Sequence, residues 1–251
     1  MPEPLRIGIV AAMKREVAGL LEGWQKSSNG QLYTCDFPQI RAALVVAGAG
    51  AANAEAASHG LICQFSPSLV LSVGFAGALL PELEVGEIIV PAQVAREGCA
   101  AELNYSTEFG EGVLLTVNRV VGKGEKAELA RRHGACAVEM EAASVASVAR
   151  ARGVKFAAIK AISDRLDDAA IDLTAPFVRP AGFDTAGFLF HIALRPKLWP
   201  AVAKLKSGSE RAGLALCHAV QEFLAAPEKF AAQQLQHTTQ TGPHNLRSGG
   251  A

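Results

Sequence analysis

Short apolar runs alternate with helical patterns over the first two thirds of the chain. Uninterrupted apolar runs rich in Val, Ile and Leu predict buried strands, whereas apolar residues spaced three or four positions apart predict helices. The predicted strands are 5–12, 31–37, 40–47, 69–74, 87–94, 112–118, 135–139 and 155–162, and the predicted helices are 15–24, 50–64, 124–132 and 142–152. Such an order is typical of an α/β domain with a twisted, mostly parallel but mixed central sheet and helices on both faces.

The pattern changes after these elements. The length of 251 residues suits one large domain, which we expect over residues 1–226. The chain from 227 onward is polar and rich in Gln and Thr, which predicts a disordered tail over 227–251.

The segment 177–205 combines aromatic and basic residues. It holds Phe177, Phe183, Phe188, Phe190 and Trp199 among the chain's 15 aromatic residues, and it contains no acidic residue after Asp184. One interpretation is that it packs into the core or into an interface between subunits. The other is a lipid-facing entrance, with the basic side chains of Arg195, Lys197, Lys204 and Lys206 at anionic headgroups.

Composition excludes several classes of protein. Lys plus Arg and Asp plus Glu both number 24, so the excess of positive charge that marks a general nucleic-acid binder is absent. The five cysteines include no C-x-x-C pair, which argues against a disulfide framework and a zinc site and favours a reduced, cytoplasmic setting. The uncharged stretch 61–81 contains prolines and glycines, so it predicts a helix end, a turn and a strand rather than a membrane span.

Polar residues and glycines follow the predicted strands one after another. These residues are Glu16, Gly48, Gly50, the segment Gly74-Phe75-Ala76-Gly77, then Glu139, Glu141, Ser163 and Asp164. Because ligands of open α/β sheets bind outside the carboxyl ends of the strands, we expect these groups to form one acidic pocket. The widely spaced histidines show no metal-ligand spacing, so no metal site is predicted.

Each of these residues also has a structural interpretation. Glu16 and Glu141 suit the first turn of a helix, the glycines suit turns, and Asp164 suits a helix cap. The segment GAGAAN at 48–53 is a broken G-x-G-x-x-G without the acid that a dinucleotide site needs about 20 residues later, which argues against a nicotinamide-dependent oxidoreductase. The joint occurrence of the acids at successive strand ends favours the pocket.

Several segments together resemble the purine nucleoside phosphorylase superfamily. They are IGIVAAMKREVAGLL, VVAGAGAANAEAA, SVGFAGALLPELEVGEIIV and AVEMEAASVASVARARGVKFAAIKAISD, between residues 5 and 166. Within the superfamily the chain is similar to the 5′-methylthioadenosine/S-adenosylhomocysteine nucleosidases. The segment LRPKLWPAVAKL at 194–205 is similar to the hopanoid-associated branch, which is thought to remove adenine from adenosylhopane.

The resemblance implies roles for the matching residues. Asp164 in AISD is expected to be the general acid that protonates adenine N7, with Ser163 holding its carboxyl group. Glu141 in VEMEA is expected to bind the ribose hydroxyls while Met140 packs against the sugar, and Glu16 is expected to orient or deprotonate the attacking water.

Further residues complete the expected binding site. Gly74, Phe75, Ala76 and Gly77 are expected to line the base and ribose, with Glu139 as a supporting acid. Phe75 stands where the family usually has a small hydroxyl residue. An aromatic side chain cannot donate a hydrogen bond to phosphate, which favours water over phosphate as the nucleophile.

The implied function is therefore cleavage of the N-glycosidic bond of a 5′-substituted adenosine, with adenosylhopane as the leading substrate and no cofactor. A methylthioadenosine-type nucleosidase, a phosphorylase and a non-catalytic nucleoside-binding module stay open. The expected setting is a cytoplasmic homo-oligomer that binds a small, lipid-linked nucleoside at the inner face of the membrane and binds no nucleic acid.

Overall fold

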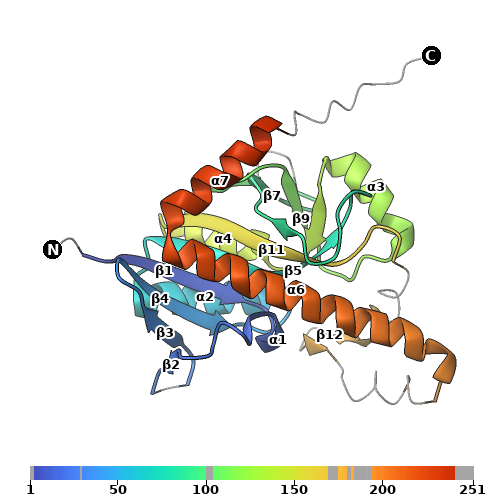
Figure 1. The fold of residues 1–251 in the computed structure, drawn as a ribbon, viewed down its shortest axis with the longest axis horizontal. Helices are drawn as coiled ribbons and strands as arrows, with labels where there is room; N and C mark the ends of the chain where they lie inside the picture. The colour runs from blue at the N-terminus through green and yellow to red at the C-terminus, as the bar shows by residue number, and fades with distance from the viewer. Residues whose placement is uncertain are drawn as a thin grey trace.

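The computed structural model describes residues 3–28, 30–99, 104–168, 175–179, 182–183, 191 and 194–240. Within these residues, eleven strands form one mixed sheet (Figure 1). Its main path is β2 (Gln25–Lys26), β3 (Tyr33–Asp36), β4 (Ile40–Val46), β1 (Leu5–Ala11), β5 (Leu69–Ala78), β10 (Ala137–Glu139), β9 (Val113–Thr116), β7 (Gln93–Arg96) and β8 (Tyr105–Ser106). Strand β11 (Lys155–Asp164) pairs with β5 and with β6 (Ile88–Ile89).

Strand β5 connects the two halves of this sheet. On one edge it pairs in parallel with β11 from Leu69 to Gly77. On the other edge its first half pairs in parallel with β1, whereas its end, Gly77 and Ala78, pairs with the antiparallel β10. The carboxyl ends of β1 and β10 therefore approach each other from opposite directions and meet beside residues 74–76 of β5.

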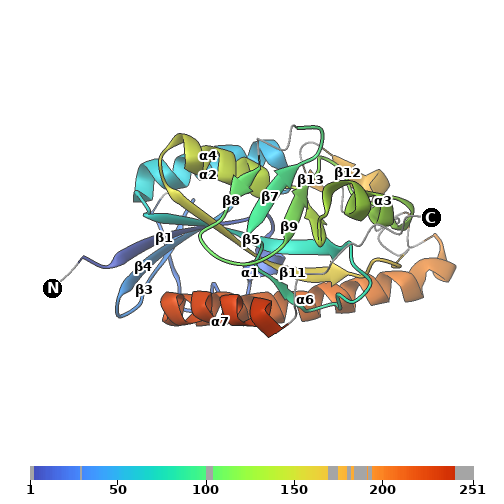
Figure 2. The ribbon, with the colours of Figure 1, turned by 90° about the horizontal axis from the view of Figure 1, so that it is seen from above.

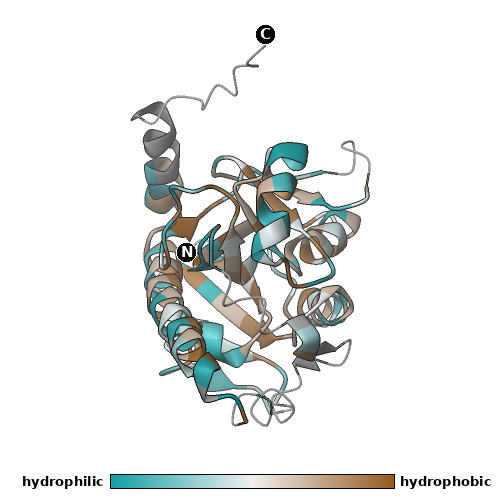
Figure 3. Ribbon diagram, turned by 90° about the vertical axis from the view of Figure 1, so that its right-hand side faces the viewer, coloured by the Kyte–Doolittle hydropathy of each residue, from teal (hydrophilic) through white to brown (hydrophobic). Residues whose placement is uncertain are grey.

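Helices cover both faces of the sheet. Helices α2 (Ala51–Phe65) and α4 (Ala142–Ala151) pack together on one face, and α6 (Trp199–Ala225) crosses the other face with α7 (Pro227–Gln240) following it (Figure 2). Alternate strand residues enter two apolar cores accordingly: Ile9 and Ile159 face α6, whereas Val10 and Ala158 face α2 and α4. Hydrophobic residues gather in the strands inside, and hydrophilic residues on the surrounding helices and loops (Figure 3).

The predicted fold class is confirmed, with local differences in the elements. Helix α1 ends after one turn, at Lys14–Val17, because Gly19 follows and Gly23 adopts a left-handed φ of +81°. The predicted strand 87–94 is divided into β6 and β7 around Pro91, which has no N–H to donate to a ladder. Helix α3 (Lys123–His133) lies where a helix was expected. Among the helices that the structure describes, none combines the length and the apolar character that a bilayer crossing requires.

The C-terminal region differs from the expected disordered tail. Residues 227–240 form helix α7, because Phe230 is buried against the rings of Phe223 and Phe109, at centroid distances of 5.5 and 6.3 Å. Residues 241–251 lie outside the described residues, as does most of 180–193 in the aromatic and basic segment. The described parts of that segment leave Leu194 and Trp199 exposed over 66% and 55% of their surface.

Candidate active site

Glu16 is a buried acid at the carboxyl end of β1. The short helix α1 places it at its third position, where its carboxylate accepts hydrogen bonds from the backbone N–H of Met13 (2.8 Å) and of Phe75 (3.3 Å). Only 2% of the residue is exposed. Burial raises the pKa of Glu16, and the two N–H donors and the nearby Lys160 ammonium oppose this rise. A fixed carboxylate whose pKa is raised by burial is suited to orient a water molecule and accept its proton.

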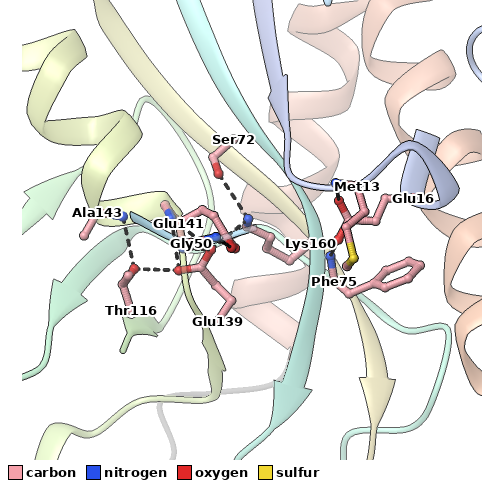
Figure 4. A network of polar contacts seen from close by, with 11 residues as sticks. Met13, Glu16, Gly50, Ser72, Phe75, Thr116, Glu139, Glu141, Ala143 and Lys160 are labelled. Atoms are coloured by element: carbon pink, nitrogen blue, oxygen red, sulfur yellow. Dashed lines mark hydrogen bonds and ion pairs between the residues drawn. The ribbon is translucent and has the colours of Figure 1, made fainter. Parts of the chain in front are cut away.

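Glu139 is the centre of a buried polar network at the end of β10 (Figure 4). Its carboxylate pairs with Lys160 Nζ at 3.0 Å and accepts a 2.6 Å hydrogen bond from Thr116 Oγ1. It also accepts the backbone N–H groups of Glu141 and Ala142, which open helix α4. These partners occupy the carboxylate, so Glu139 holds the start of α4 in place. This geometry fits the supporting part of the expected role.

Lys160 joins the two sides of the site. It lies in the middle of β11, is 1% exposed, and donates to Ser72 Oγ at 3.1 Å besides pairing with Glu139. Figure 4 places its ammonium between the group around Glu141 and the group around Glu16. Its positive charge opposes the rise in the pKa of Glu16 and of Glu141 that burial causes.

Glu141 is the N-terminal cap residue of helix α4 and reaches back across the site. One of its carboxylate oxygens accepts the backbone N–H of Gly50 at 2.6 Å. Burial, followed by the charge of Glu139, raises the pKa of Glu141 to about 7, while Lys160 and the Gly50 N–H oppose the rise. Gly50 has a φ of +96°, a conformation that glycine adopts without strain. The predicted glycine turn and the predicted acid thus form one structural unit.

The glycines of β5 leave room for two of the acids. A Cβ atom on Gly74 would lie 3.2 Å from Glu16 Oε1, and a Cβ atom on Gly77 would lie 2.9 Å from Asp164 Oδ2. Any larger residue at these positions would displace a carboxylate. Gly74 and Gly77 were expected to line the base and ribose. In the structure these two glycines let the backbone of β5 approach the carboxylates of Glu16 and Asp164 closely.

Asp164 ends β11 and is 4% exposed. Ser163 Oγ donates to its Oδ1 at 2.8 Å, in line with the expected holding role of Ser163. Its Oδ2 is ion-paired with Lys126 Nζ, which comes from helix α3. Asp164 is thus a buried carboxylate with a charged partner.

The structure places Glu16 beside Gly74 and Phe75 of β5, and Asp164 beside Gly77 of the same strand. Phe75 contributes its backbone N–H to Glu16 while its ring packs against the core that faces α6. Ala76 lies buried between the two glycines, with its carbonyl accepting from Ser163 Oγ at 3.4 Å. Met140 is partly buried against a separate apolar cluster around β9 and β10.

Two buried lysines of this region were not predicted. Lys160 had a visible signal, because a charge inside the apolar run KFAAIKAI must find a partner once the strand is buried. Lys126 had none, since it stands among the charged residues of a surface helix. Among the described residues, no group of His, Cys, Asp and Glu side chains has the arrangement of a metal site.

Comparisons with known proteins show the family and the fold of the chain. A model described as the phosphorylase superfamily matches residues 6–110 and 95–179. The 5′-methylthioadenosine/S-adenosylhomocysteine nucleosidase of Geobacillus thermodenitrificans is 26% identical over 199 residues, which are 64% of this chain and 84% of the relative.

Solved structures share the fold at lower identity. A 5′-methylthioadenosine/S-adenosylhomocysteine nucleosidase from Neisseria meningitidis, in complex with methylthio-immucillin-A, has a TM-score of 0.68 at 19% identity, over 88% of this chain and 99% of that chain. Futalosine hydrolase of Helicobacter pylori has a TM-score of 0.64 at 18% identity, over 93% and 98% of the two chains.

Proposed function

Because this chain belongs to the phosphorylase superfamily, we propose that it cleaves the N-glycosidic bond of a 5′-substituted adenosine with water and releases adenine. The observation that carries the proposal is the row of acids Glu16, Glu141 and Asp164 at the carboxyl ends of β1, β10 and β11. Each acid has a separate setting and a separate task there.

The reaction places charge at two positions. As the bond between C1′ and N9 breaks, positive charge develops on the ribose and negative charge on the departing adenine. Asp164 protonates N7 and neutralises the adenine, a step that general acids accelerate by roughly 10²–10⁴-fold. Glu141 binds the ribose hydroxyls and stabilises the oxocarbenium character electrostatically. Glu16 accepts a proton from the water that attacks C1′.

We further propose adenosylhopane as the substrate. This rests on the similarity of 194–205 to the hopanoid-associated branch and on the surface that this segment presents. Leu194 and Trp199 are exposed there, and Lys204 and Lys206 have 62% and 77% of their side chains exposed. An apolar surface beside basic side chains suits a nucleoside whose 5′ group is a polycyclic lipid.

A second candidate is a nucleosidase for 5′-methylthioadenosine or S-adenosylhomocysteine. The specific observation in its favour is the relative with that name, of which this chain matches 84%. The two candidates share the chemistry at the ribose and the base and differ in the 5′ group.

The test compares adenine release from adenosylhopane, 5′-methylthioadenosine, S-adenosylhomocysteine and adenosine, each with and without phosphate. We expect adenosylhopane to give the highest kcat/KM and phosphate to leave the rate unchanged. A higher kcat/KM for 5′-methylthioadenosine would support the second candidate. A saturable acceleration by phosphate with a ribose-1-phosphate product would show a phosphorylase. Absence of adenine from every substrate would contradict the proposed function itself.

A further inference from the structure

Lys126 is a buried cation that no step of the proposed reaction uses. Helix α3 otherwise exposes its charged residues, but Lys126 is 0% exposed. Its ammonium pairs with Asp164 Oδ2 and donates to the backbone carbonyl of Arg165 at 2.6 Å. Burying an ammonium is costly unless it is paired, so a lysine brought to this carboxylate from a separate helix calls for a functional account.

The surroundings of Asp164 leave Lys126 as its charged partner among the described residues. Strand β5 faces it with Gly77, which has no side chain, and its own strand supplies the neutral Ser163. The guanidinium of Arg165 pairs with Glu84 and Asp167. On the side of α6, Lys204 pairs with Asp168.

We propose that Lys126 and Asp164 form a proton-relay dyad, in which Lys126 supplies the proton that Asp164 passes to the purine. The inference rests on the proposed function. Lys126 acts through Asp164 and is a positioning and proton-supplying residue.

The step balances as follows. When the C1′–N9 bond breaks, its electron pair goes to the purine, the proton of the Lys126 ammonium passes through Asp164 to N7, and the pair is left as a neutral amine beside a carboxylate. The attacking water forms the new bond to C1′ and gives one proton to Glu16. Exchange with solvent then returns a proton to Lys126 and removes one from Glu16, so that the net reaction adds one hydroxyl group to C1′ and one proton to adenine, the elements of one water molecule.

The dyad predicts a particular pH dependence. An ammonium group ordinarily keeps its proton to a much higher pH than a carboxyl group does. In Lys126→Met, Asp164 must bind the proton alone, and a single carboxyl group loses it at a lower pH. The ratio of variant to wild-type kcat/KM cancels the titration of Glu16 and Glu141, because both proteins contain these acids.

The experiment measures this ratio from pH 5 to pH 8.5 on the best adenosine substrate. We expect Lys126→Met to lose about 100-fold or more at pH 8 and to recover to within about 10-fold of wild type at pH 5.5. Lys123→Met, at an exposed position on the same helix, is the matched control and should show a ratio near one throughout. If Lys126→Met does not fold, Lys126→Gln, which keeps a hydrogen-bond donor but has no proton to give, is measured instead.

A merely structural lysine gives a different result. A loss that is the same at every pH, or no loss at all, would overturn the dyad and leave the proposed function standing. Absence of adenine release by the wild type would instead remove the function on which the inference rests.

Discussion

Three carboxyl groups of this site differ in what surrounds them, and the differences separate their roles. Glu16 is held by backbone N–H groups, Glu141 lies near a second carboxylate, and Asp164 lies against an ammonium. Substitution of each acid by its amide keeps the shape and removes the charge, so the three variants should fail in three different ways.

Asp164→Asn should abolish adenine release while the protein stays folded. Asparagine can donate a hydrogen bond to N7 but cannot transfer a proton, so we expect a loss of about 10²–10⁴-fold in kcat. Steady-state kinetics measures the loss of kcat, and circular dichroism shows whether the variant is folded. Near-normal turnover by the purified variant would show that Asp164 is not the general acid.

Glu141→Gln should act mainly through the ribose. A hydrogen bond to a charged group contributes about 1.5–3 kcal/mol, so the ribonucleoside should lose roughly 10–100-fold in kcat/KM. The 2′-deoxy substrate lacks one of the hydroxyls that Glu141 binds and should lose less. Equal losses for the two sugars would mean that Glu141 only holds the turn at Gly50.

The same residue predicts how stability depends on pH. The pKa of Glu141 is about 7 in the folded protein and returns to about 4.5 on unfolding, so the folded state binds the proton more tightly. Its contribution to stability is therefore present below pH 4.5 and is lost as the pH rises to 7.

Urea denaturation at pH 5 and pH 8 measures this effect. Glutamine does not titrate, so the decrease in unfolding free energy between the two pH values should be smaller in Glu141→Gln by on the order of 1–3 kcal/mol. An unchanged pH dependence would contradict the raised pKa. Glu16 has a raised pKa as well and should keep part of the decrease in both proteins.

Much of the site at this scale follows from the sequence, because a polar residue after an apolar strand is visible in the printed chain. The acids Glu16, Glu141 and Asp164 were found in this way. The partners of these acids were not, because Lys126 and Thr116 come from other elements and meet the acids only through the tertiary fold.

At the scale of elements, the glycines of strand β5 set how closely its backbone approaches the candidate acids Glu16 and Asp164. Gly77→Ala would place a methyl group 2.9 Å from Asp164 Oδ2, and Asp164 is held on its other sides by Ser163 and Lys126. We expect the carboxyl group to shift and kcat/KM to fall by about 10–100-fold. Gly124→Ala, where the added carbon meets open space, is the matched control and should stay active. Full activity of Gly77→Ala would show that Asp164 does not need its position beside Gly77 for the reaction.

Helix α7 is the element that the sequence pattern missed. Its Gln- and Thr-rich composition indicates disorder, but one buried aromatic residue, Phe230, anchors it on Phe223 and Phe109. Phe230→Ala should reduce the free energy of unfolding by about 3 kcal/mol. Lys229→Ala, exposed next to it, should change stability little. Equal stability of the two variants, measured by urea denaturation, would show that α7 is not anchored in solution.

The sequence pattern also could not predict that β10 pairs antiparallel with β5. Apolar runs separated by helices favour parallel strands, and the runs at β1, β4, β5 and β11 do pair in parallel. The three residues of β10 are too few to carry a direction in their pattern. Their pairing with Gly77 and Ala78 is set by the fold on either side.

At the scale of the whole molecule, the proposed lipid-linked substrate predicts contact with a membrane surface. The triple variant Lys197→Glu, Lys204→Glu, Lys206→Glu removes basic charges that contribute about 1 kcal/mol each near anionic lipid. We expect the wild type to float with anionic liposomes at low salt and the triple variant to stay in the soluble fraction. The exposed positions Arg41, Arg131 and Lys155, changed to Glu together, form a charge-matched control that should still float.

The outcomes of flotation separate two explanations. If neither the wild type nor any variant floats at any salt concentration, the segment 194–206 does not meet lipid, and an interface between subunits or a core role remains for it. Loss of flotation in the control as well would mean that net charge alone decides binding.

The meeting of β1 and β10 along one edge of β5 makes the site a joint between two half-sheets. Only β5 and its neighbour β11 run through this joint, so each half can change its outer strands, loops or partners without altering the other. Glu16 comes from one half of the sheet and Glu141 from the other. The distance between them therefore depends on the register in which β1 and β10 pair with β5. An evolutionary change of register on either side would therefore retune the catalytic spacing while leaving both apolar cores intact.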